Sequence, residues 1–170
     1  MMTLVILFGA ALLYGDGGDD RLKGGSGHDG LLGGDGDDLL VGGGGRDVMI
    51  GGLGADRIVG NSDDDILIAG WTDFDDRAVA LLVILDEWIS SRDYTQRTEN
   101  IRGIGAGPTF EERRNGEFYL RNGDEFLGAV ATVHDDDAPD TLTGSAGQDW
   151  FFANLLFDDG DDANRKDKIT

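Results

Sequence analysis

Apolar and polar positions recur with a fixed nine-residue period between Gly15 and Ile68. Six consecutive phrases follow this period without a gap: GDGGDDRLK, GGSGHDGLL, GGDGDDLLV, GGGGRDVMI, GGLGADRIV and GNSDDDILI. Position 1 is always glycine, position 6 is always aspartate and position 8 is always apolar. The residues at position 8 are Leu22, Leu31, Leu40, Met49, Ile58 and Leu67. Such a short period indicates a solenoid, in which each unit buries its apolar face by stacking on its neighbours.

Each phrase divides into a glycine-rich half and a short apolar half. Glycine supplies the left-handed backbone angles that tight turns need, so the first half predicts a turn. Side chains alternate along a strand, so in the second half position 8 points inward while positions 7 and 9 point outward. Two phrases would form one coil, and stacked coils would give two parallel sheets facing each other across a thin core. The predicted fold is therefore mainly β, a parallel β-roll.

A helical period replaces the nine-residue period after Ile68. Apolar residues fall on one helical face, which predicts a helix that starts near Thr72 or Asp73 and runs to about Ser90. A second short helix is predicted over Tyr94–Arg102, because glycines and a proline follow it.

A β-hairpin is predicted beyond the helices. Its strands are Phe118–Leu120 and Phe126–Val133, and Asn122-Gly123 between them is a tight-turn signal. Helix and hairpin together form a module that we expect to pack on the roll or to cap it.

The outward positions of the even phrases give this module a surface to cover. They carry no polar residue: Gly30, Leu32, Val48, Ile50, Ile66 and Ile68. A sheet face this apolar is not expected to stay in water. We predict that the helix and hairpin module packs on it; solvent-exposed Ile50 and Ile68 would contradict the prediction.

The nonapeptide returns after this module, in Asp135–Thr143 (DDDAPDTLT) and Gly144–Phe152 (GSAGQDWFF). The second copy fits the pattern better than the first. The two copies place Asp140 and Asp149 at position 6, where a metal ligand and a plain turn aspartate are equally good interpretations. The aromatic residues of the second copy are expected to close the end of the core, as a terminal repeat must.

Two interpretations fit the apolar stretch in residues 1–14. A signal-peptide core is one, but no Lys or Arg precedes it and no clear cleavage site follows. Counting back nine residues from Leu22 reaches Leu13, which favours the other interpretation, a degenerate first coil or cap. The predicted division is then this coil, the roll over 15–70, and a helix-plus-hairpin module over 71–170 that ends in a degenerate coil.

Position 6 carries the candidate chemistry. Its aspartates would line up along the coil edges at roughly 5 Å spacing and would repel one another unless a cation lay between them. Carboxylates together with turn carbonyls form an all-oxygen shell. Such a shell suits Ca²⁺ better than Mg²⁺, because Ca²⁺ takes about 6 to 8 oxygens in adaptable geometry. The candidate ligands are Asp20, Asp29, Asp38, Asp47, Asp56 and Asp65.

Composition agrees with a metal-dependent fold. The 170 residues include 14 basic and 34 acidic side chains, for a formal net charge of -20. This charge argues against binding to nucleic acid or to anionic membranes and makes divalent cations the expected partners. The chain has no cysteine, so bound metal is the remaining staple. A flexible acidic linker is the alternative, but a linker has no reason to keep position 8 apolar.

The repeated phrase resembles the GGxGxDxUx nonapeptide of RTX, or haemolysin-type, calcium-binding repeats. The resemblance implies a parallel β-roll with calcium held between turns on the same edge of successive coils. It pairs Asp20 with Asp38, Asp29 with Asp47, Asp38 with Asp56, and Asp47 with Asp65. Sites at the two ends are the less regular ones, because Asp16, Asn61 and Asp63 replace glycines.

The resemblance also implies a location. RTX sites fill where calcium is plentiful, outside the cell, and stay empty in the cytosol. The pattern after the roll, including EWISSRDYTQRTENIRGIG and DTLTGSAGQDWFFA, is similar to the C-terminal segment of some large bacterial surface or secreted proteins.

Catalytic interpretations find little support in the residue inventory. The two histidines, His28 and His134, belong to no HExxH motif, and no GxSxG motif occurs. We expect His28 to be a solvated turn residue. The leading hypothesis is a monomeric, non-catalytic, extracellular module that folds on binding calcium. The alternatives are an export and stability appendage of a larger secreted hydrolase and a segment of an adhesin.

Overall fold

The computed structural model describes residues 1–5, 9–122, 130–153 and 168–170. The chain forms two compact units. The first comprises Met1–Trp71 together with Asp135–Thr170, and the second comprises Thr72–His134. The returning repeats thus belong with the roll, whereas the sequence groups them with the helices that precede them.

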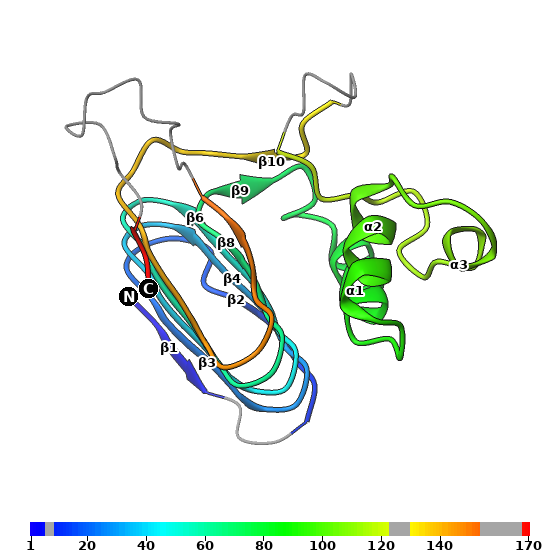
Figure 1. Ribbon diagram of the computed structural model, residues 1–170. Helices are drawn as coiled ribbons and strands as arrows, with labels where there is room; N and C mark the ends of the chain where they lie inside the picture. The colour runs from blue at the N-terminus through cyan, green and yellow to red at the C-terminus, as the bar shows by residue number, and fades with distance from the viewer. Residues whose placement is uncertain (6–8, 123–129, 154–167) are drawn as a thin grey trace. The chain divides into compact units, whose positions relative to one another are not determined.

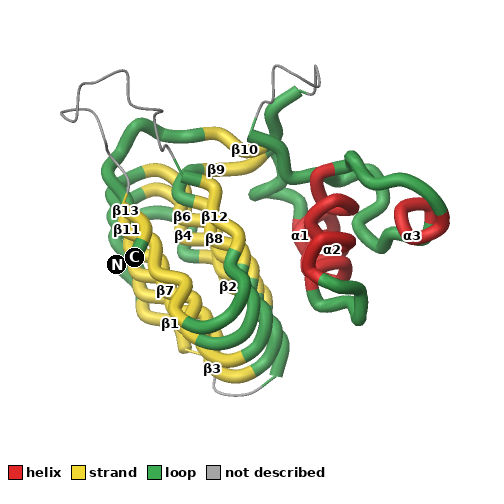
Figure 2. The backbone as a smooth tube through the Cα atoms, viewed as in Figure 1, coloured by secondary structure: helices red, strands yellow, loops and turns green. Residues whose placement is uncertain are grey.

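Two parallel sheets build the first unit, which is a β-roll (Figures 1 and 2). One sheet has the order β1-β3-β5-β7-β11-β13, with β1 (Thr3–Val5), β3 (Arg21–Ser26), β5 (Leu39–Gly44), β7 (Arg57–Asn61), β11 (Thr141–Ser145) and β13 (Lys168–Ile169). The other has the order β12-β8-β6-β4-β2, with β2 (Leu12–Tyr14), β4 (Gly30–Asp35), β6 (Val48–Leu53), β8 (Ile66–Ile68) and β12 (Trp150–Phe152). Alternate strands pair, so two phrases form one coil, and the predicted fold class is confirmed.

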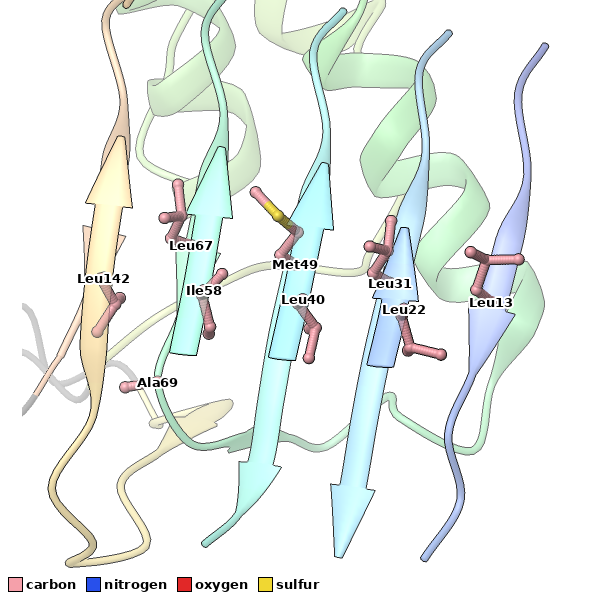
Figure 3. Packing of buried hydrophobic residues seen from close by; sticks show 9 residues of the cluster. All are labelled: Leu13, Leu22, Leu31, Leu40, Met49, Ile58, Leu67, Ala69 and Leu142. Atoms are coloured by element: carbon pink, nitrogen blue, oxygen red, sulfur yellow. The ribbon is translucent and has the colours of Figure 1, made fainter. Parts of the chain in front are cut away.

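Position 8 of each phrase supplies the core between the two sheets (Figure 3). The cluster consists of Leu13, Leu22, Leu31, Leu40, Met49, Ile58, Leu67, Ala69 and Leu142. Within one sheet Leu22 pairs in register with Leu40, which in turn pairs with Ile58. Each sheet contributes a single row of side chains, so the core is thin. Phe151 packs against the far end of this cluster, next to Leu67.

Glycine allows the turns of successive coils to stack closely. Gly43 has a φ of 119°, and a Cβ at this position would lie 2.0 Å from the carbonyl oxygen of Gly25 in the preceding coil. The residues that replace glycines keep the same backbone. Asp16, Asn61 and Asp63 have φ of 66°, 83° and 70°, values that Asn and Asp tolerate better than most residues. The irregular first and sixth phrases therefore still form turns.

The first coil comes from the N-terminal residues. β1 pairs with β3 and places Leu4 beside Leu22, and β2 pairs with β4 and places Leu13 beside Leu31. These strands continue the roll by one coil.

The outward face of the even strands is buried. Ile50 and Ile68 are 2% and 0% exposed. The solvent exposure that would have contradicted a covered face is therefore not observed. Packing of the helical unit there stays a prediction.

The second unit contains α1 (Ala78–Trp88), α2 (Tyr94–Arg102) and α3 (Pro108–Glu111). At its base β9 (Trp71–Thr72) pairs with β10 (Val133–His134). The short α3 has no counterpart in the sequence prediction. None of the helices in the described part of the chain is long and apolar enough to cross a membrane.

The helix predicted from Thr72 to Ser90 is shorter than expected. Thr72 donates from its N–H and from its hydroxyl to the Asp75 carboxylate, the latter at 2.5 Å. This local turn competes with helix, because Thr and Asp side chains offer the backbone other hydrogen bonds. The helix starts only at Ala78. The second predicted helix has the expected bounds, with Asp93 accepting from the N–H of Gln96 as its N-cap.

The predicted hairpin is wrong in its first strand. Phe118–Leu120 is irregular, because the Asn115 side chain donates to the carbonyl of Phe118 and Leu120 donates to the carbonyl of Ile101. Gly123 of the Asn-Gly turn and residues 126–129 of the second strand lie outside the described residues; of the remaining part only Val133 is in a strand, β10.

A buried carboxylate organises the second unit. Glu87 is fully buried and accepts from Arg92 at 3.1 Å, from the Asn100 amide at 2.8 Å and from the N–H of Arg114 at 2.7 Å. Two helices and two loops of the unit converge on this one side chain. It is a satisfied structural ion pair and not a candidate active site.

Candidate metal sites

The aspartates at position 6 form two rows along the roll, one on each edge. Edge 1 carries Asp20, Asp38, Asp56 and Asp140, and edge 2 carries Asp29, Asp47, Asp65 and Asp149. Each aspartate immediately precedes a strand, and all except Asp140 follow a turn that contains glycine, so the strand pairing sets the spacing of the row. Every pair that the RTX resemblance predicts consists of neighbours in one of these rows.

One carboxylate oxygen of each aspartate is used by the fold. Oδ1 of Asp38 accepts from the backbone N–H of Asp20 in the preceding coil at 2.6 Å. The same bond repeats along both edges, with distances up to 3.0 Å. These bonds fix the rotamer of each carboxylate, so that its second oxygen points in the same direction in every coil.

The second oxygen has no hydrogen-bond partner among the described residues. This holds for Oδ2 of all six predicted ligands, and each of these atoms is buried. A buried charged oxygen without a partner is costly, and several in a row are costlier. The predicted ligands are Asp20, Asp29, Asp38, Asp47, Asp56 and Asp65.

A backbone carbonyl faces the same space as each unpartnered carboxylate oxygen. A Cβ added to Gly33 would lie 2.3 Å from Oδ2 of Asp38 and 2.4 Å from the carbonyl oxygen of Gly51 in the next coil. The arrangement recurs at Gly15, Gly24, Gly42, Gly51 and Gly60, where both oxygens lie within 3.1 Å of the added Cβ. Two acceptors facing each other without a proton donor fit a cation between them.

No three or more His, Cys, Asp or Glu side chains of the described residues are grouped to hold a metal ion. At most two of these side chains therefore meet at one site, and the turn carbonyls beside Oδ2 are further protein oxygens available to a shell. A shell rich in carbonyl oxygens suits Ca²⁺ and not the strictly octahedral Mg²⁺. The donor set therefore fits calcium.

Burial shifts the acid equilibria of these groups. It raises the pKa of Asp47 and Asp56 to about 8 and that of Asp65 to about 9. The N–H donated to each carboxylate opposes the shift, and the neighbouring carboxylates of the row add to it. In the absence of a cation the fold therefore disfavours the ionised form of these groups.

Acid is expected to stabilise the calcium-free chain. A carboxyl whose folded pKa of about 8 exceeds its unfolded value of 3.8 stabilises the fold when protonated, and this contribution is lost as pH rises through the folded pKa. Lowering the pH of calcium-free buffer from about 8 to about 5 should then shift the chain from the unfolded toward the folded form. Circular dichroism at each pH measures the gain of β signal. With saturating calcium the sign should reverse, because protons compete with the metal for the same oxygens. Equal pH dependence in both buffers would contradict the assignment.

From the sequence, Asp140 and Asp149 could be either metal ligands or plain turn aspartates. The structure places both in the rows of position 6 aspartates. The N–H of Asp56 donates to Oδ1 of Asp140 at 2.7 Å, and that of Asp65 donates to Oδ1 of Asp149 at 3.0 Å. Their spacing from the preceding members is 84 residues instead of 18. A search at the fixed period cannot find them as neighbours of Asp56 and Asp65.

The first coil has no carboxylate in either row. The N–H groups of Met2 and Ala11 donate to Oδ1 of Asp20 and Asp29. These residues occupy the places that position 6 has elsewhere, which is why the N-terminal residues do not match the repeat in sequence.

A second set of bonds at position 5 was not predicted. Oδ1 of Asp37 accepts from the N–H of Ala55 at 2.9 Å, and Nδ1 of His28 accepts from the N–H of Arg46 at 2.8 Å. These side chains accept from the following coil, whereas position 6 accepts from the preceding one. His28 is therefore a coil-to-coil acceptor and not a freely solvated turn residue. The sequence signal that could have indicated these bonds is a polar residue that recurs at position 5 every 18 residues.

Two rows of buried carboxylates on the edges of a parallel roll define a metal-binding β-solenoid. The family model for the RTX calcium-binding nonapeptide repeat (4 copies) matches residues 9–40, 41–73 and 132–162, more than half of the chain. The chain belongs to this family, whose repeats bind Ca²⁺ in a β-roll. No curated protein and no solved structure in the comparisons matches it.

Proposed function

We propose that the chain is a non-catalytic, extracellular calcium-binding module that folds when calcium binds. The observation that supports it is the buried, unpartnered Oδ2 at each of the six candidate ligands, which are Asp20, Asp29, Asp38, Asp47, Asp56 and Asp65. In this proposal the ion lies between neighbouring coils on one edge. The family relationship supports calcium as the ion.

The two oxygens of each carboxylate have separate tasks in this mechanism. Oδ1 holds the N–H of the preceding coil and so sets the register, as at Asp47, where the N–H of Asp29 donates at 2.8 Å. Oδ2 and the facing carbonyl are left for the ion, which supplies positive charge where the fold gathers only acceptors. Because this arrangement exists only in stacked coils, the free energy of calcium binding becomes free energy of folding.

The remaining parts of the proposal follow from charge and calcium supply. Such sites need calcium at concentrations found outside cells, which supports an extracellular location. A net charge of -20 disfavours nucleic acid and anionic membranes as partners. We propose a monomer with three parts: a first coil in residues 1–14, the roll over 15–70, and residues 71–170, in which the helical unit precedes repeats that rejoin the roll.

Asp47→Asn tests the ligand assignment. The amide keeps the oxygen that accepts from Asp29 but removes the charged ligand, so we expect calcium affinity at this site to fall by roughly 10- to 100-fold. In calcium the variant should melt at a lower temperature than the parent. In EDTA it should be at least as structured, because a buried charge has been removed and the new N–H₂ group faces the carbonyl of Gly60. Calorimetric titration and circular dichroism measure the two effects.

Asp37→Asn is the matched control. It removes the same charge from an exposed position 5 side chain of edge 1 and keeps the acceptor for Ala55. Its calcium affinity should stay within about threefold of the parent, the range of a weakly coupled surface charge. Equal losses of calcium affinity in both variants would mean that the overall negative charge of the chain, and not the buried row of aspartates, binds the ion.

A further inference from the structure

One turn of the roll is interrupted by the whole helical unit. Ala69 stands at position 1 of this turn: a Cβ at Gly51 would lie 2.4 Å from the carbonyl oxygen of Ala69 and 2.3 Å from Oδ2 of Asp56. Position 6 of the same turn is Asp140, whose Oδ1 accepts from the N–H of Asp56 at 2.7 Å. The helical unit, Thr72–His134, lies between these two positions in the chain (Figure 1).

The roll resumes in register after the interruption. Thr141 in β11 pairs with Arg57 in β7, and Phe151 in β12 pairs with Leu67 in β8. The N–H of Gly54 donates to Oδ2 of Asp136 at 2.7 Å, which closes the split turn from its other side. The last coil is therefore built like the others, although its strands come from beyond an insertion.

The second edge of this coil carries the same features. A Cβ at Gly60 would lie 2.2 Å from Oδ2 of Asp65 and 3.0 Å from the carbonyl oxygen of Gly144. Oδ1 of Asp149 accepts from the N–H of Asp65. On edge 2, oxygens from before and after the helical unit therefore face one space. On edge 1 the two facing oxygens both precede the unit, and Asp140, which follows it, is joined to Asp56 through Oδ1.

We infer that the last coil holds composite calcium sites whose occupancy is coupled to the folding of the inserted helical unit. The edge 1 site takes Oδ2 of Asp56, the carbonyl of Ala69 and the carboxylate of Asp140, so it joins the two chain segments that flank the insertion. The inference rests on the proposed function. It adds that calcium in the last coil stabilises the folded helical unit, and that the folded helical unit raises the calcium affinity of the last coil.

Chain entropy gives the size of this coupling. Asp56 and Asp140 are 84 residues apart, whereas Asp38 and Asp56 are 18 apart. With a three-halves power dependence on loop length, joining the longer segment is about tenfold less favourable when the intervening chain is unfolded. Calcium in the last coil should then bind about tenfold more weakly than in the inner coils.

The folded helical unit removes this disadvantage because it holds its own ends together. The N–H of Asp73 donates to the carbonyl of Thr132 at 3.0 Å, and Nε2 of His134 lies 2.8 Å from Oδ1 of Asp73. β9 and β10 pair at the same place. Coupling between two equilibria is reciprocal, so calcium in the last coil stabilises the helical unit by the same factor of about ten.

Hydrogen exchange of the full chain during a calcium titration tests the coupling. Trp88→Ala is the variant, because Trp88 is fully buried in the helical unit and stacks under the Arg97 guanidinium at 4.6 Å. Protection of β11 should require roughly tenfold more calcium in the variant than in the parent. Protection of β3 and β5, which lie in the same sheet, should keep its midpoint. Leu82→Ala, at a side chain 49% exposed on the same helix, is the control and should shift nothing.

The reverse direction uses Asp140→Asn, which keeps an acceptor for the N–H of Asp56. At a calcium concentration that fills the last coil of the parent but not that of the variant, exchange of α1 and α2 should become about tenfold faster than in the parent; in EDTA it should be unchanged. An unshifted β11 midpoint in Trp88→Ala, or an equal shift of β3, β5 and β11, would overturn the coupling. Protection of β3 and β5 that does not depend on calcium in the parent would instead overturn the proposed function.

Discussion

Removing calcium with EDTA is expected to abolish most of the parallel β-structure of the roll. Without the ion, buried carboxylate oxygens face carbonyl oxygens along both edges, and each added coil repeats the same unfavourable contact. The position 8 core is a single row of side chains from each sheet, so little else opposes unfolding. We expect loss of the β signal in infrared and circular dichroism spectra and a radius of gyration that rises by roughly twofold or more.

Restoration by different cations is the control for this experiment. Excess CaCl₂ should recover the spectrum fully. MgCl₂ at the same ionic strength should not, because Mg²⁺ demands near-octahedral geometry and gives up its water reluctantly. A chain that stays compact in EDTA with an unchanged spectrum would show that the roll folds without metal, and the proposed function would fall.

The strict repeat explains how much of the site the sequence predicts. Glycine at position 1, aspartate at position 6 and an apolar residue at position 8 have no exceptions in six phrases, and each corresponds to one structural element: the close approach of two turns, the coil-to-coil bond and the core. Asp38 illustrates this, since its partner Asp20 lies one coil of 18 residues away. The edge rows thus follow from counting alone.

The two phrases of the last coil are visible in the sequence, but their place in the edge rows could not be predicted by counting. The step from Asp56 to Asp140 is 84 residues, which is not a multiple of nine, so the insertion destroys the phase of the repeat. Only three-dimensional pairing of β7 with β11 restores it. Sequence periodicity detects a solenoid unit by its neighbours in the chain, whereas the unit is stabilised by its neighbours in space.

The errors in the helical unit have a different origin. The expected helix start at Thr72 is displaced by a local turn in which Thr72 binds Asp75, and the expected strand at Phe118 is displaced when the Asn115 side chain takes its carbonyl. In both places a polar side chain outcompetes the regular backbone partner. Hydrophobic periodicity contains no information about such bonds, so it sets the type of element better than its ends.

Gly33→Ala is expected to have the second large effect, a near-complete loss of calcium-dependent folding. The added Cβ would lie 2.3 Å from Oδ2 of Asp38 and 2.4 Å from the carbonyl oxygen of Gly51, far inside contact distance. The carbonyl belongs to the backbone of the next coil, so relief requires moving that coil and with it the facing oxygens. We expect a loss of several kcal/mol in the calcium-loaded state, in the range of severe steric substitutions.

Gly44→Ala separates this steric effect from the general loss of a glycine. Gly44 is the last residue of β5 and has no positive φ. A Cβ added there would meet no atom within 4 Å. Replacing it should leave calcium-dependent folding intact and add up to about 1 kcal/mol of stability, because alanine has fewer unfolded conformations to lose. Calcium titrations followed by circular dichroism compare the two variants directly. If Gly33→Ala folds at the same calcium concentration as Gly44→Ala, the facing oxygens are free to separate, and the ion need not lie between them.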